Sequence, residues 1–118
     1  RALHSYPTRR SSDLEPDYFL RGRFMDIVGL TVSGNDIKHW RLDRRDGGGM
    51  VINLWGRGRS YGDKCEASVR IPNGTRFERA LYPSDLKVTP DGKWLELEWT
   101  GPVASIVMEG KYEEEIDD

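Results

Sequence analysis

The sequence predicts an all-β protein, a small antiparallel β-sandwich or partly open barrel of six or seven strands within residues 15–111. Several short segments alternate apolar and polar side chains with a period of two, as half-buried strands do. Turn-forming residues separate these segments, and no repeat, heptad or low-complexity core is present. At 118 residues, with four Trp, five Tyr and three Phe, the chain has room for one domain and enough aromatic residues to fold.

Residues 64–71 form the clearest predicted strand. Its apolar positions, which we expect to face the core, are Cys65, Ala67, Val69 and Ile71. The following Pro72-Asn73-Gly74 favours a turn, because Asn and Gly tolerate a positive φ.

A hairpin is predicted farther along the chain, with its turn at residues 89–93 and its strands at 85–88 and 94–99. Apolar side chains alternate with Trp and Glu in the second strand: Leu95, Leu97 and Trp99 against Trp94, Glu96 and Glu98. One face of this strand is therefore expected to be core and the other to face water.

Four less regular strands are expected at residues 20–31, 37–42, 50–55 and 103–108. Asp26 interrupts the alternation of the first. Three consecutive glycines within residues 43–49 favour a flexible hairpin loop over a tight one. Residues 75–81 lack clean alternation, so either a short helical turn or an irregular strand fits them.

The first fourteen residues need a separate interpretation. The run from His4 to Leu14 resembles one translated frame of a common high-throughput sequencing adapter, from which it differs only at Tyr6, and the chain begins with Arg1. We therefore interpret residues 1–14 as a non-native, adapter-derived segment of a metagenomic or transcriptomic reading frame. That interpretation leaves the native N-terminus, and any earlier strand, unknown. The alternative is a natural basic, Ser-rich tail that binds nucleic acid.

The other end of the chain is strongly acidic. Residues 112–118 have no apolar periodicity, which predicts a solvated, flexible tail. The alternative is that the tail folds back over the more basic first half of the domain and competes with an acidic ligand.

Targeting signals and cysteines place few limits on localisation. No apolar run approaches the roughly 20 residues of a membrane-spanning helix, and no signal peptide is visible. We expect a soluble protein. The single cysteine, Cys65, excludes an internal disulfide and a thiolate metal cluster. It fits a reducing compartment without proving one, so localisation stays open.

Catalytic groupings are scarce. Outside residues 1–14 the single histidine is His39, which excludes a three-histidine zinc site. Cys65 falls on an apolar strand face, where a thiol is usually a small core residue. Glu96 and Glu98 share a strand face and could act as paired carboxylates, but a solvated face explains them more simply. The loop at 43–49 lacks the full calcium-binding pattern. We predict no cofactor and no metal site, and we favour binding over catalysis.

The strongest candidate site is the loop of residues 55–63. It combines aromatic faces that can stack on sugars or bases, arginine forks that bind carboxylate or phosphate, and glycines that let a ligand approach the backbone. The residues expected to bind a ligand are Trp55, Arg57, Arg59 and Tyr61, with Trp40 and Arg41 from the preceding strand. The competing interpretation is a flexible connection with Trp55 anchored in the core.

Three functions remain as expectations. The first is a non-catalytic ligand-binding β module, such as a carbohydrate-binding or accessory domain, whose partner is a glycan or another polar ligand. The second is a structural or assembly subunit that contacts a protein partner. The third is an oligonucleotide-binding barrel. It is disfavoured because residues 15–108 carry fourteen basic against thirteen acidic side chains, whereas nucleic acid selects strongly basic surfaces.

Overall fold

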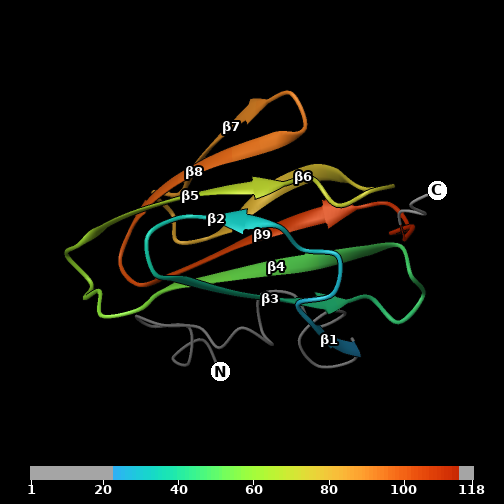
Figure 1. The fold of residues 1–118 in the computed structure, drawn as a ribbon, viewed down its shortest axis with the longest axis horizontal. Helices are drawn as coiled ribbons and strands as arrows, with labels where there is room; N and C mark the ends of the chain where they lie inside the picture. Colours follow the sequence, from blue (N-terminus) through green and yellow to red (C-terminus); the bar gives the residue numbers. More distant parts are fainter. Residues whose placement is uncertain (1–22, 115–118) are drawn as a thin grey trace, which may run out of the picture.

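The computed structural model describes residues 23–114, in which nine strands form two antiparallel sheets (Figure 1). Sheet A has the spatial order β1 (Arg23–Asp26), β3 (Ile37–Asp43), β4 (Gly49–Gly56), β9 (Val103–Glu109) and β6 (Arg76–Tyr82). Sheet B has the order β2 (Val32–Ser33), β5 (Lys64–Arg70), β8 (Trp94–Thr100) and β7 (Lys87–Asp91). This architecture confirms the predicted sandwich class, with more strands than the six or seven expected. The suspected adapter-derived segment lies outside the described residues.

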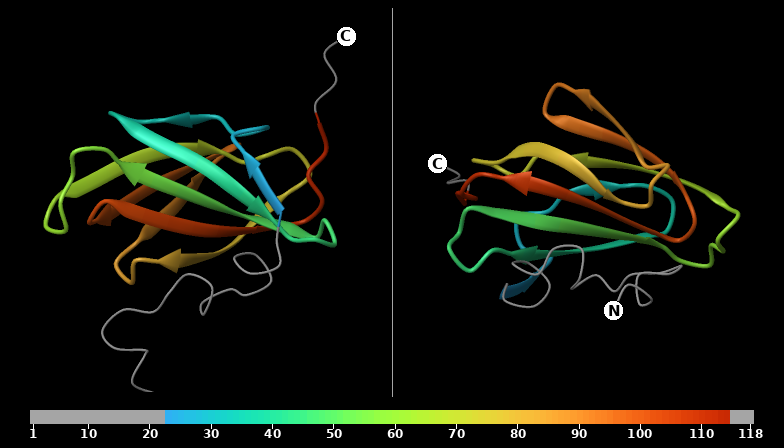
Figure 2. Two further views of the ribbon diagram at one scale, coloured as in Figure 1. Left: turned by 90° about the horizontal axis from the view of Figure 1, so that it is seen from below. Right: turned by 180° about the vertical axis from the view of Figure 1, so that it is seen from behind.

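The core lies between the two sheets, which form the two layers of the molecule (Figure 2). Both sheets contribute fully buried side chains, among them Met50, Ile52, Leu54, Ile106 and Met108 from sheet A and Val69 and Leu95 from sheet B. Burial of each such side chain stabilises the fold by about 1.5–3 kcal/mol. Within the described part of the chain, no helix is long and apolar enough to cross a membrane.

The predicted alternation in β5 and β8 is confirmed. Cys65, Ala67 and Val69 are buried while Lys64 and Glu66 are exposed, and in β8 the leucines and Trp99 are buried. The two strands pair antiparallel along their whole lengths. The predicted hairpin between β7 and β8 also forms, although β7 continues to Asp91. Pro90 therefore lies within a strand at the edge of sheet B. Proline is tolerated there, because an edge strand has no second neighbouring strand to accept a hydrogen bond from its backbone N–H.

The segment expected as one strand at 20–31 contains only β1 in its described part, and β2 begins just after it at Val32. Leu30 N donates a hydrogen bond to the carbonyl of Ile27, and Gly29 adopts a φ of 76°. The resulting turn sends β1 into sheet A and β2 into sheet B. Asp26, which breaks the alternation, lies where the register between β1 and β3 shifts.

The ambiguous segment at 75–81 is an irregular strand, β6. Its pairing with β9 shifts register between Phe77 and Arg79 and again between Ala80 and Tyr82. Each bulge inserts an extra residue, so the inward and outward positions lose their simple period of two. The bulges therefore explain why the sequence shows no clean alternation here.

The hairpin loop between β3 and β4 is compact rather than open. Arg44 N donates to the carbonyl of Gly49 at 2.9 Å, and Gly47 N donates to the carbonyl of Arg44 at 3.0 Å. Gly48 N is bound by Asp46 Oδ1 at 2.8 Å. Glycine at position 47 permits the φ of 77° that this turn requires.

The first residues of the expected acidic tail pack against the domain. Tyr112 is half-buried and contacts the core. Glu113 N donates to the carbonyl of Asn73 at 2.9 Å, and Asn73 Nδ2 donates to the carbonyl of Glu113 at 3.0 Å. The packed domain thus extends past residue 111, and residues 115–118 of the expected tail lie outside the described part.

Candidate ligand-binding groove

The structure distributes the six predicted site residues over four places. Trp40 and Trp55 lie on the outer face of sheet A, because their positions alternate with those of the core residues on β3 and β4. In the register Trp40 is opposite Asn53 and Trp55 is opposite Lys38. Trp55 is 42% exposed, so it is not anchored in the core.

Arg41 points into the molecule and is 2% exposed. Its Nη1 donates to the carbonyl of Val28 at 2.6 Å and its Nη2 to Asp43 Oδ2 at 3.0 Å. The guanidinium carbon lies 4.4 Å from the centre of the Tyr112 ring. These contacts hold Arg41 inside the fold, so it is not part of the site that we propose.

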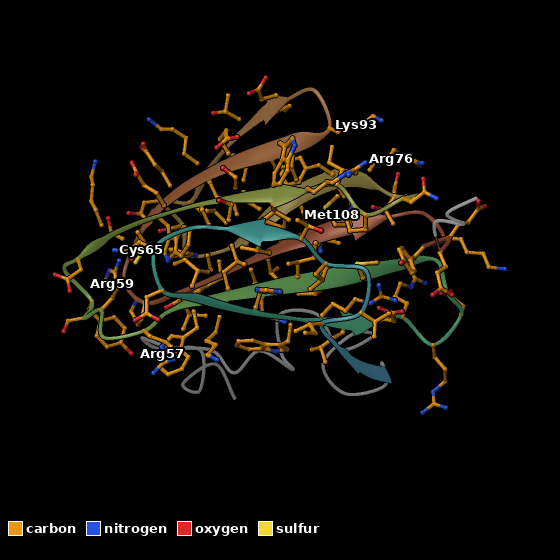
Figure 3. All side chains as sticks on the ribbon, in the orientation of Figure 1. Arg57, Arg59, Cys65, Arg76, Lys93 and Met108 are labelled. Atoms are coloured by element: carbon orange, nitrogen blue, oxygen red, sulfur yellow. The ribbon has the colours of Figure 1, made fainter. Side chains whose placement is uncertain are left out.

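The loop between β4 and β5 closes one end of the sandwich. Arg57 and Arg59 lie at this end, whereas Lys93 and Arg76 lie toward the other (Figure 3). Arg57 N donates to the carbonyl of Asp36 at 3.0 Å, and Asp63 Oδ2 accepts the N–H of Ser60 at 2.8 Å. Tyr61 projects from the loop and is 81% exposed.

Arg59 connects this loop to the turn between β2 and β3. Its Nη1 donates to the carbonyl of Arg57 at 3.0 Å, and its Nη2 donates to the carbonyl of Asn35 at 3.2 Å. These two bonds fix the guanidinium at the margin of a groove on the outer face of sheet B. Of the six residues predicted from the sequence, Arg59 is the one that lines this groove.

The groove has a volume of about 740 Å³. Three strands supply most of its polar lining: β5 with Lys64, Glu66 and Ser68, β8 with Glu96 and Glu98, and β7 with Lys87 and Thr89. Ser33 and Asn35 line it on the β2 side. The lining side chains of β5 and β8 occupy the positions that alternate with the core residues of the same strands.

The strand registers arrange this lining in transverse rows. Glu98 lies opposite Glu66 on one side and opposite Lys87 on the other, which makes one charged row. In the next row Glu96 lies between Ser68 and Thr89, and Ser68 Oγ donates to Glu96 Oε1. Directly opposed side chains in such rows have Cβ atoms about 5 Å apart. A ligand crossing the sheet therefore meets several polar groups at once.

Trp94 occupies the next row along the sheet, just beyond the residues that line the groove. It lies opposite Arg70 on β5 and opposite Asp91 on β7, and it shares the outer side of β8 with Glu96 and Glu98. Its side chain is half-buried. Sequence reasoning placed Trp94 on the face away from the core but assigned it no role.

His39 and Cys65 lie apart from the groove lining. His39 is opposite Leu54 in sheet A. The thiol of Cys65 is buried and donates to the carbonyl of Gly101 at 3.1 Å. Burial raises the pKa of this thiol, an effect that outweighs the opposing influence of Arg59, so at neutral pH it stays protonated and weakly nucleophilic. Within residues 23–114 no three His, Cys, Asp or Glu side chains are placed to hold a metal ion.

Comparison with protein-family models, curated proteins and solved structures finds no match to this chain. The functional argument therefore rests on the geometry and chemistry of the groove.

Proposed function

We propose that this protein is a non-catalytic ligand-binding β module that takes a carbohydrate in the groove on the outer face of sheet B. The groove itself carries the proposal, because its volume of about 740 Å³ falls within the range of small-ligand sites. Most of its lining stands on strands whose alternate residues form the core. The backbone of such strands is held rigidly, so little ordering of the backbone is required when a ligand binds.

The chemistry of the lining suits hydroxyl groups, each of which both donates and accepts hydrogen bonds. Glu96 and Glu98 offer acceptors, Lys64 and Lys87 offer donors, and Thr89 offers both. A carbohydrate presents many hydroxyls at close spacing and can therefore satisfy several of these groups together.

Isothermal titration of the protein with oligosaccharides tests this proposal. Suitable probes are cellohexaose, xylohexaose, mannohexaose and laminarihexaose, together with oligogalacturonate and heparin fragments. Glu96→Gln should weaken the binding of whichever probe binds by roughly 10-fold or more, because a hydrogen bond to a charged group contributes about 1.5–3 kcal/mol.

Glu78→Gln is the matched control, because Glu78 is an exposed residue of β6 and does not line the groove. It should leave affinity unchanged. Thermal unfolding of each variant verifies that the fold is intact. Failure of every probe to bind, or an equal loss of affinity in both variants, would contradict the proposal.

A second function, contact with a protein partner in an assembly, is favoured by the exposure of Trp55 and Tyr61. Trp55 lies near the end of β4 and Tyr61 lies in the loop between β4 and β5, and neither lines the groove. Exposed aromatic side chains are enriched at the centres of protein interfaces. Sedimentation velocity of the native protein and of the Trp55→Ala and Tyr61→Ala variants tests this role. Self-association of the native protein that is lost in both variants would support it. A sharp monomeric profile of the native protein at all concentrations would count against it.

A further inference from the structure

The charges in the groove on the outer face of sheet B cancel. Three cationic side chains line it, Arg59, Lys64 and Lys87, and three anionic ones, Glu66, Glu96 and Glu98. The two signs are interleaved, since Lys87 lies directly opposite Glu98. A ligand of uniform charge would approach side chains of its own sign wherever it lay in the groove, within the Debye length of about 8 Å at physiological salt.

Polyanions and polycations are therefore both poor ligands for this surface. Glu66 and Glu98 are directly opposed, so an anionic ligand near the middle of the groove would add a third negative charge beside them. The row formed by Ser68, Glu96 and Thr89 bears a single charge, and Ser68 already binds that carboxylate. Uncharged hydroxyl groups avoid the repulsion and still form hydrogen bonds with these residues.

Trp94 adds an apolar surface on the same face, one row beyond the residues that line the groove. Its position is two residues from Glu96 on β8, about 7 Å along the strand. In the register Trp94 pairs with Arg70 at one end of β5, whereas Lys64, which lines the groove together with Arg59, begins that strand at the other end. The face of a sugar ring that carries C–H groups can pack on an indole, whose large apolar area contributes strongly to binding.

We infer that the groove binds an uncharged oligosaccharide that lies along β5 and β8, with one sugar ring packed against Trp94. This inference rests on the proposed function, because it names the class of carbohydrate and the residue that orients it. The hydroxyls of the sugar contact Ser68, Thr89 and Glu96. Arg59 lies toward the end of the oligosaccharide that is farther from Trp94.

The test compares the neutral hexaoses named above with oligogalacturonate and heparin fragments, at low and at high salt. We expect at least one neutral hexaose to bind, with an affinity that changes by less than about twofold between the two salt concentrations. The acidic probes should bind weakly or not at all. Trp94→Ala should weaken the binding of the neutral probe by roughly 10-fold, whereas Trp94→Tyr, which keeps an aromatic face, should retain most of it.

Trp55→Ala is the control, because Trp55 lies on the outer face of sheet A. The inference would be overturned if the acidic probes bound preferentially, with an affinity that falls with salt. If that binding still depended on Glu96 or Lys87, the groove would remain the ligand site. Unchanged affinity for the neutral probe in folded Trp94→Ala would also overturn the inference. Absence of binding by both classes of probe would overturn the inference together with the proposed function.

Discussion

Arg41 shows most clearly how a residue's position decides its role. Its guanidinium is held between the carbonyl of Val28, the carboxylate of Asp43 and the ring of Tyr112. Arg41→Ala removes one member of a largely buried ion pair and should lower the free energy of unfolding by about 2–4 kcal/mol. Urea denaturation measures the loss. Lys38→Ala, an exposed position on the same strand, should change stability by less than about 0.5 kcal/mol, and an equal effect of the two substitutions would contradict this role.

Cys65 gives a prediction that depends on pH. Its thiol is buried, and its pKa in the folded protein lies above the ordinary value of 9.0. Because the folded pKa is raised, the stabilising contribution of the protonated thiol is present below the unfolded pKa and is lost as pH rises through the folded pKa. The free energy of unfolding of the native protein should therefore fall above about pH 9 more steeply than that of Cys65→Ala. Parallel pH profiles from urea denaturation would contradict the assignment.

Among the structural elements, the turn after β5 is fixed by the segment that follows β9. Gly74 has a φ of 87°, and a Cβ at this position would overlap the carbonyl oxygen of Lys111. Gly58 has a similar φ of 73° but open space around it. Gly58→Ala should therefore cost about 1 kcal/mol of unfolding free energy from backbone strain alone, and Gly74→Ala at least about 1 kcal/mol more. Similar losses in urea denaturation would show that the turn and the C-terminal segment are not packed as described.

The strands also show which elements a sequence can reveal. The strands β5 and β8 follow a strict period of two because one face of each is core, and both were predicted within two residues of their limits. The strand predicted at 20–31 was too long and β2 was not predicted, because the turn at Gly29 depends on which sheet each strand joins. The strand β6 was ambiguous because two bulges interrupt its alternation.

For the whole molecule, the sandwich could be predicted but the groove could not. The outward positions of Glu96 and Glu98 follow from the alternation in β8. The groove over these residues depends instead on how β5, β7 and the turn near Asn35 surround that strand. Trp55 and Arg59 are close in the sequence, yet the loop between β4 and β5 crosses from sheet A to sheet B and separates them. Residues that are close in the sequence were therefore predicted to form one site, although the fold separates them.

We propose that the ligand binds on the outer face of sheet B and not on that of sheet A. Amide chemical-shift mapping by NMR, during titration with the neutral hexaose that binds most tightly, tests it most directly. We predict shifts concentrated at Ser68, Thr89, Trp94 and Glu96, with Trp40 and Trp55 unchanged. Shifts concentrated at Trp40 and Trp55, with β5, β7 and β8 unaffected, would place the ligand on sheet A and contradict the proposed site.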